Sequence, residues 1–117
     1  MPNSAVHYCN ILQRRSLRII VHYNLLKLTR NADVTEIYFR CRKIYAELEL
    51  ALPFLHNAEV YRCETARDSN ADIMMAVHLD GPEYLNDFLH HPKYLALVDD
   101  IKDYVMDSMA FDGKEAC

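Results

Sequence analysis

The stretch IIVHYNLLKLTRNADVTEIYFRCRKIYAELELAL, residues 19–52, changes its hydrophobic period half-way and thereby decides the fold. Residues 19–28 are rich in β-branched and aromatic side chains that alternate between two faces, which predicts a strand. The polar segment TRNAD follows, and apolar residues then recur at helical spacing up to residue 52, which predicts a helix. A strand followed by an amphipathic helix indicates a domain that combines helices with a sheet.

The ends of this predicted helix carry signals of their own. Asp33, with Glu36 three residues later, is typical of an N-cap with its capping-box partner. Pro53 is expected to end the helix, because the residue before a proline is disfavoured in helical geometry. The apolar face of the helix is expected to comprise Ile37, Cys41, Ile44, Tyr45, Leu48 and Leu52.

Two further strands and a second helical region are predicted downstream. The strands cover 58–66 and 72–80, and the polar turn RDSNA (67–71) joins them. Pro82 then opens a helical region that Pro92 interrupts. After the interruption we expect one apolar face, formed by Leu95, Val98, Ile101 and Val105.

A closing strand at 105–113 completes the order βαββαβ. This is an α+β arrangement, the ferredoxin-like split unit, in which a four-stranded antiparallel sheet carries helices on one face. The other face needs a cover, and self-association about a two-fold axis into a homodimeric α/β barrel is the most economical one. The side chains expected at this dimer interface are Tyr23, Leu25, Met74, Ala76, His78, Met109 and Phe111.

The composition is that of one globular domain. The chain has 117 residues, of which 51% are hydrophobic and 26% charged, and no apolar run approaches membrane-spanning length. The net charge is −4, but the N-terminal part of the chain carries basic residues and no acidic ones. We therefore divide the chain into a basic N-terminal extension (1–18), the folded domain (19–113) and a tail (114–117). The acidic body argues against nucleic-acid binding unless the extension does it. A transit-like leader in the extension stays open as an alternative.

The cysteines and histidines do not form a metal site. The four cysteines are scattered without a C-x-x-C pair, so we expect reduced thiols and a cytoplasmic protein. No H-x-x-x-H pattern, clustered carboxylate–histidine set or glycine-rich loop occurs. We therefore expect neither a metal nor a cofactor.

Two segments resemble a known family. VHYNLLKL (21–28) is similar to the opening IxHIVLFKLK of the stress-responsive A/B barrel (Dabb) domain family. ADIMMAVHLDGPEYLNDFLHHPKYLALVDDI (71–101) is similar to that family's DLALxxEFxDxEALxAYxxHPxHxxFVxxI. The resemblance extends over about residues 19–112 and implies a homodimer whose two sheets form an eight-stranded barrel.

The resemblance also implies a site between sheet and helices. A plant branch, resembling olivetolic acid cyclase, uses a histidine just after its HP pair as general base and a tyrosine three residues before its HP histidine. In this chain the HP histidine is His91 and the strand-one histidine is His22, whereas the base position holds Tyr94 and the tyrosine position holds Phe88. Tyrosine, with a pKa of about 10, is a far poorer base at neutral pH than imidazole. The cyclase mechanism therefore does not transfer, and a substitute pair of His90 with Tyr94 is the weaker alternative.

His22 and His91 are the weak catalytic candidates. His22 lies on the predicted helix-facing side of its strand beside Asn24, where polar groups must be hydrogen-bonded or face a cavity. His91 is read first as a residue that bonds free backbone groups at the Pro92 break. The expected ligand site comprises His22, Asn24, Leu26, Met75, Phe88, His91 and Tyr94.

Three functions remain open. The leading hypothesis is a homodimer that holds a small apolar or aromatic molecule without established chemistry. The second is a cofactor-free enzyme of the same fold, either cyclase-like or monooxygenase-like. The third is a structural dimer without a pocket.

Overall fold

The computed structural model describes residues 19–114. The predicted N-terminal extension and residues 115–117 of the predicted tail lie outside this range. The strands are β1 (Ile20–Leu28), β2 (Leu55–Arg62), β3 (Ile73–Leu79) and β4 (Val105–Gly113). The helices are α2 (Val34–Ala51), α3 (Leu85–Leu89) and α4 (Pro92–Ile101), with 3-10 turns at Pro82–Tyr84 and Lys102–Tyr104.

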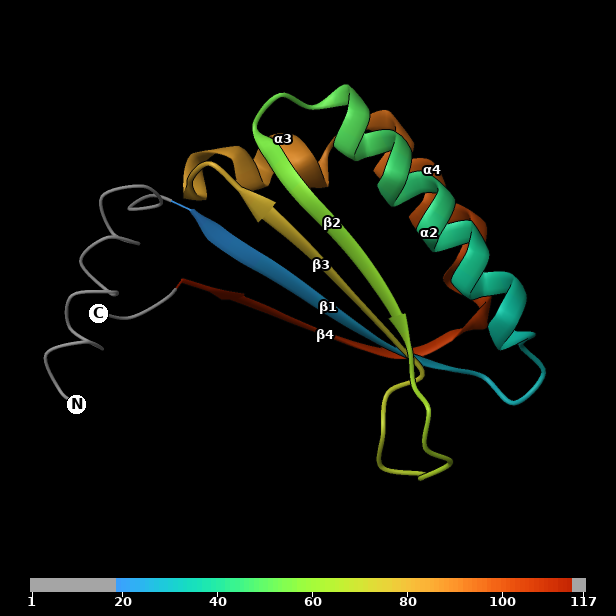
Figure 1. The fold of residues 1–117 in the computed structure, drawn as a ribbon. Helices are drawn as coiled ribbons and strands as arrows, with labels where there is room; N and C mark the ends of the chain where they lie inside the picture. Colours follow the sequence, from blue (N-terminus) through green and yellow to red (C-terminus); the bar gives the residue numbers. More distant parts are fainter. Residues whose placement is uncertain (1–18, 115–117) are drawn as a thin grey trace, which may run out of the picture.

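The strands form one antiparallel sheet in the order β2-β3-β1-β4. The helices lie together on one side of this sheet, and the other side is open (Figure 1). The predicted α+β class and ferredoxin-like βαββαβ order are thereby confirmed. No helix among residues 19–114 is long and apolar enough to cross a bilayer.

The first helix begins and ends where the sequence indicates. The Asp33 carboxylate accepts a hydrogen bond from the backbone N–H of Glu36, at 3.2 Å, so the predicted N-cap is present. The Glu36 carboxylate pairs with the Arg40 guanidinium, four residues along the helix. At the other end, Leu52 has extended geometry and Pro53 follows it.

The second strand is displaced from its predicted position. It runs from Leu55 to Arg62, whereas the sequence pattern predicts 58–66. The register shifts between Leu55 and Asn57, and this irregularity hides the first residues of the strand from an alternation pattern. At the far end the chain leaves the sheet, and residues 63–72 form a long loop to β3 rather than the short predicted turn.

The predicted apolar face of the last helix is right at Ile101 and wrong at Leu95 and Val98, and Val105 already belongs to β4. Tyr94, Leu97 and Ile101 are buried on α4, whereas Leu95 and Val98 are exposed. Tyr94 and Ile101 are seven residues apart and therefore share one face of the helix with Leu97, whereas Leu95 points about a third of a turn away from that face.

Removal of the Asp33 cap provides a test of the local stability of α2. Asp33→Ala leaves an amide of the first turn without its side-chain acceptor, and we expect it to lower the free energy of unfolding by about 1 kcal/mol. Urea denaturation followed by circular dichroism measures this. Asp68→Ala, in the exposed loop between β2 and β3, is the control; equal losses in the two variants would contradict the capping role.

Candidate functional site

The inner strand β1 carries two polar side chains toward the helices. Alternation along β1 places His22, Asn24 and Leu26 on its helix side, and β3 and β4 flank the strand on both edges. His22 is only 4% exposed, while Asn24 is half-buried. A buried imidazole such as that of His22 requires hydrogen-bond partners, or a function that uses its free nitrogen.

One nitrogen of His22 is held by a carboxylate from the edge strand. The register pairs His22 with Asp112 of β4, and His22 Nδ1 lies 2.6 Å from Asp112 Oδ1. An ionised carboxylate can only accept, so Nδ1 carries a proton, and in the neutral imidazole Nε2 is then the acceptor. This Nε2 atom is buried and has no hydrogen-bond partner among the described residues.

Phe88 packs at the centre of an aromatic group around this histidine. Its ring centroid lies 6.1 Å from that of His22 and 5.9 Å from that of Tyr45, both edge to face. Tyr94 lies closer, at 5.0 Å, and its hydroxyl bonds the side chain of Asn24. The group therefore joins α2, α3 and α4 to the inner strand of the sheet.

The interior keeps its phenols and its thiol in the neutral form. Burial raises the pKa of Tyr45 well above its ordinary value, and the neighbouring Tyr94 and Cys41 add to this. Burial also raises the pKa of Tyr94, against an opposing contribution from the Asn24 hydrogen bond. The pKa of the Cys41 thiol rises to about 12, again because of burial. At neutral pH these three groups are therefore protonated, and none of them acts as a base.

The other predicted ligand residues divide into two groups. Leu26 and Met75 are buried in the core with His22, Phe88 and Tyr94. His91 lies elsewhere: its Nδ1 accepts a hydrogen bond of 3.1 Å from the Lys93 amide and caps α4.

His90 does not join Tyr94 in an acid–base pair. Its ring is exposed, and its Nδ1 bonds the backbone carbonyl of Asn86 at 2.8 Å. Tyr94 is buried and bonds Asn24 instead.

The open face carries the residues that the sequence analysis assigns to a dimer interface. The strand register places Tyr23 beside Ala76 and Phe111, and Leu25 beside Met74 and Met109. Met109 and Phe111 are 68% and 62% exposed, although Ala76 is already buried within the single chain. The interface itself stays a prediction.

Glu59 of β2 organises the polar part of this open face. Its carboxylate accepts hydrogen bonds from Asn57 and Tyr61, and His78 Nε2 lies 3.2 Å away. A hollow beside it is lined by Tyr23, Glu59, Tyr61, Met74, Ala76 and His78.

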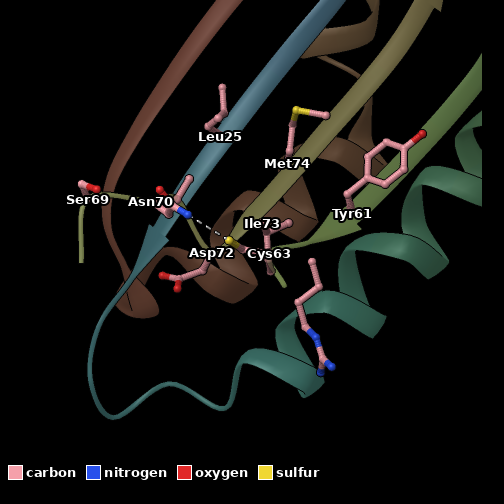
Figure 2. A pocket seen from close by; sticks show the side chains of 10 residues that line it. Leu25, Tyr61, Cys63, Ser69, Asn70, Asp72, Ile73 and Met74 are labelled. Atoms are coloured by element: carbon pink, nitrogen blue, oxygen red, sulfur yellow. Dashed lines mark hydrogen bonds between the residues drawn. The ribbon is translucent and has the colours of Figure 1, made fainter. Parts of the chain in front are cut away.

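A second hollow, of about 430 Å³, lies where the loop between β2 and β3 meets the open face (Figure 2). Leu25, Tyr61 and Met74 line it from the strands, and Ser69 and Asn70 line it from the loop. The two hollows contain no member of the predicted ligand site.

Sequence reasoning missed two members of the group around His22. Asp112 has the correct strand parity, but the pairing of β1 with β4 cannot be read from the sequence. Tyr45 was assigned to the apolar helix face and read only as packing. No group of metal-ligating side chains occurs within residues 19–114.

Comparison with protein families decides the relationship. The family model of the stress responsive A/B barrel domain matches residues 20–115. The chain belongs to this family. No functionally curated protein matches it in sequence.

Solved structures share the fold of this A/B barrel domain at low identity. A dimeric protein of unknown function with ferredoxin-like fold from Bacteroides fragilis is similar with a TM-score of 0.74 and 13% identity, over 83% of this chain and 96% of that one. A hydroxynitrile lyase from Passiflora edulis has a TM-score of 0.67 and 9% identity, over 82% and 92%. The cofactor-independent oxygenase SnoaB from Streptomyces nogalater has a TM-score of 0.65 and 11% identity, over 83% and 92%. At these identities the similarity establishes the fold alone.

The two described cysteines of this A/B barrel domain differ in exposure and in the direction of their pKa shifts. Hydrogen bonds with the backbone and side chain of Thr65, and with Asn70, lower the pKa of the exposed Cys63 thiol. Burial raises that of Cys41 to about 12.

We therefore expect iodoacetamide at pH 7.5 to alkylate Cys63 and to spare Cys41 in the native protein, because the thiolate is the nucleophile. Peptide mass spectrometry measures the modification, and labelling in urea is the control in which both should react. Native labelling of Cys41 at the rate of Cys63 would contradict the assigned burial.

Proposed function

We propose that this A/B barrel protein is a homodimer that binds a small apolar or aromatic molecule between its sheet and helices, in the cytoplasm. The observation that carries the proposal is His22, whose Nδ1 is held by Asp112 while its buried Nε2 lacks a partner. A buried acceptor without a partner costs about 1–3 kcal/mol. A ligand that donates an O–H or N–H to Nε2 would recover this free energy.

The surroundings of His22 favour an aromatic ligand. Tyr94 provides an aromatic ring, and Met75 provides a thioether that adapts to the shape of its neighbours. The Tyr94 hydroxyl bonds the Asn24 side chain, whereas His22 Nε2 on the same strand has no partner among the described residues. His91 is retained in the proposed site as the cap that fixes the start of α4.

The open face supports the dimeric state. Met109 and Phe111 expose large apolar areas on the same face as Tyr23 and Leu25. A soluble protein rarely leaves such a patch uncovered. The similar protein from Bacteroides fragilis is described as dimeric, which agrees with a second copy, related by a two-fold axis, that covers this face.

A cofactor-free enzyme is the second candidate. Here His22 Nε2 would take a proton from an activated C–H or O–H, and the Asp112 carboxylate would stabilise the imidazolium that forms. The hydroxynitrile lyase and the cofactor-independent oxygenase of the same fold support this candidate by analogy.

A thermal-shift screen tests the ligand site. We expect aromatic compounds to raise the melting temperature of the wild type more than fatty-acid-like compounds do. A ligand that binds only the native state adds about 2.7 kcal/mol to the free energy of unfolding at a hundredfold excess over its Kd. The shift should disappear in His22→Ala and persist in His56→Ala, whose ring is exposed. Equal shifts in both variants would remove His22 from the site; the absence of any shift would leave a structural dimer.

A charge on the open face tests the dimer. Leu25→Lys should convert the protein into a monomer or unfold it, because the ammonium would face the apolar surface of the second copy. Sedimentation velocity at micromolar concentration measures the species. Leu50→Lys, at a position on α2 that is 90% exposed, should leave the dimer intact. A wild type that sediments as a monomer would refute the proposed assembly.

A further inference from the structure

A second polar atom without a partner lies in the same layer as His22. The hydroxyl of Tyr45 is buried, and like His22 Nε2 it has no hydrogen-bond partner among the described residues. The whole Tyr45 side chain is 1% exposed, so solvent does not satisfy it. A hydroxyl at such a position in the middle of a helix is costly to keep, because phenylalanine would fill the same volume without the unmade hydrogen bond.

The neighbours of Tyr45 do not explain its hydroxyl. Tyr94 bonds Asn24, and Cys41 is a buried neutral thiol one helical turn away. A third buried atom without a partner, Glu47 Oε2, belongs to a different setting, since the other oxygen of that carboxylate lies 3.5 Å from Lys93 Nζ. Among the described residues, the unpaired buried atoms that lie on side chains packed against Phe88 belong to His22 and Tyr45.

Phe88 connects these two residues. Its ring contacts the imidazole of His22 and the phenol of Tyr45, both edge to face, and it is completely buried. It comes from the short helix α3, just before the break at His90 and His91. One apolar ring thus packs against both side chains whose polar atoms have no hydrogen-bond partner among the described residues.

We propose that Tyr45 provides the second polar contact of the ligand site, so that the ligand is a small ring with two separated polar groups. One group donates to His22 Nε2 and the other bonds Tyr45 Oη, while the ring takes space that Phe88 yields. This inference rests on the proposed function and makes it more specific. It disfavours hydrocarbons, fatty acids and rings with a single polar group as the preferred ligand.

The specificity for two polar groups is tested with matched pairs of compounds. Each dihydroxybenzene isomer is compared with the methylphenol of the same substitution pattern, which replaces one hydroxyl by a methyl group of similar size. NMR titration of the full-length protein gives the Kd values. For the isomer that fits the separation of the two atoms, we expect the dihydroxybenzene to bind about fivefold to tenfold more tightly than its methylphenol, as one added hydrogen bond predicts.

Tyr45→Phe is the decisive variant. It should abolish this preference while leaving the affinity for the methylphenol unchanged, and the melting temperature of the free protein should rise, because a buried hydroxyl without a partner is removed. Tyr38→Phe, at a half-buried position on the same helix, is the control and should keep the preference. Phe88→Leu should tighten the binding of both members of each pair, since it vacates the space that the ring takes.

The outcomes separate this inference from the proposed function. If methylphenols and dihydroxybenzenes bind the wild type equally, or if Tyr45→Phe keeps the preference, the role of Tyr45 is wrong while the His22 site stands. If neither class binds, the His22 site fails and the inference fails with it. Weaker binding to a folded Phe88→Leu protein would refute displacement of the ring.

Discussion

The position of β1 inside the sheet is the constraint on which this structure depends. Because β3 and β4 both pair with it, its two faces are fixed together, and a slip by one residue would exchange the helix side with the open side. The same alternation that aims His22 and Asn24 at the helices aims Tyr23 and Leu25 at the open face. The interior site and the surface available to a second copy are thus set by one strand.

The bond between His22 and Asp112 extends this constraint to the edge of the sheet. Asp112 is partly exposed, so the pair is screened and is a modest source of stability. Its larger effect is to select the ring tautomer and to orient Nε2 into the interior. Among residues 19–114, His22 Nε2 and the Tyr45 hydroxyl are thus buried without a hydrogen-bond partner around Phe88. Natural proteins tolerate such costs most readily where a ligand or a reaction uses the unpaired groups.

The break before Pro92 shows how this chain differs from the plant cyclases that it resembles. His91 is committed to the N-cap of α4, and the position of the cyclase base holds Tyr94, which bonds Asn24 and whose pKa is raised by burial. Phe88 occupies the position of the cyclase tyrosine and contributes only its ring. The helical corner therefore lacks the acid–base groups of the cyclase pattern, and the buried polar ring of this chain lies on β1, at His22.

The sequence by itself determined the element types, the caps of the first helix, the break before Pro92 and the side of β1 on which each residue lies, because these follow from periods and local bonds that act within a few residues. It also identified His22 as an inward polar residue. The sequence could not predict the contact between His22 and Asp112. These residues are ninety positions apart, and the strand register that joins them depends on backbone bonds that leave no local pattern. The start of β2 was obscured by an irregularity in pairing. The buried face of α4 differed because Tyr94 and Leu97, rather than Leu95 and Val98, face the core with Ile101. The tertiary structure alone decided that Tyr45 and His22 meet the same ring of Phe88 with their polar atoms unpaired, because only the packing of helices on the sheet brings them together.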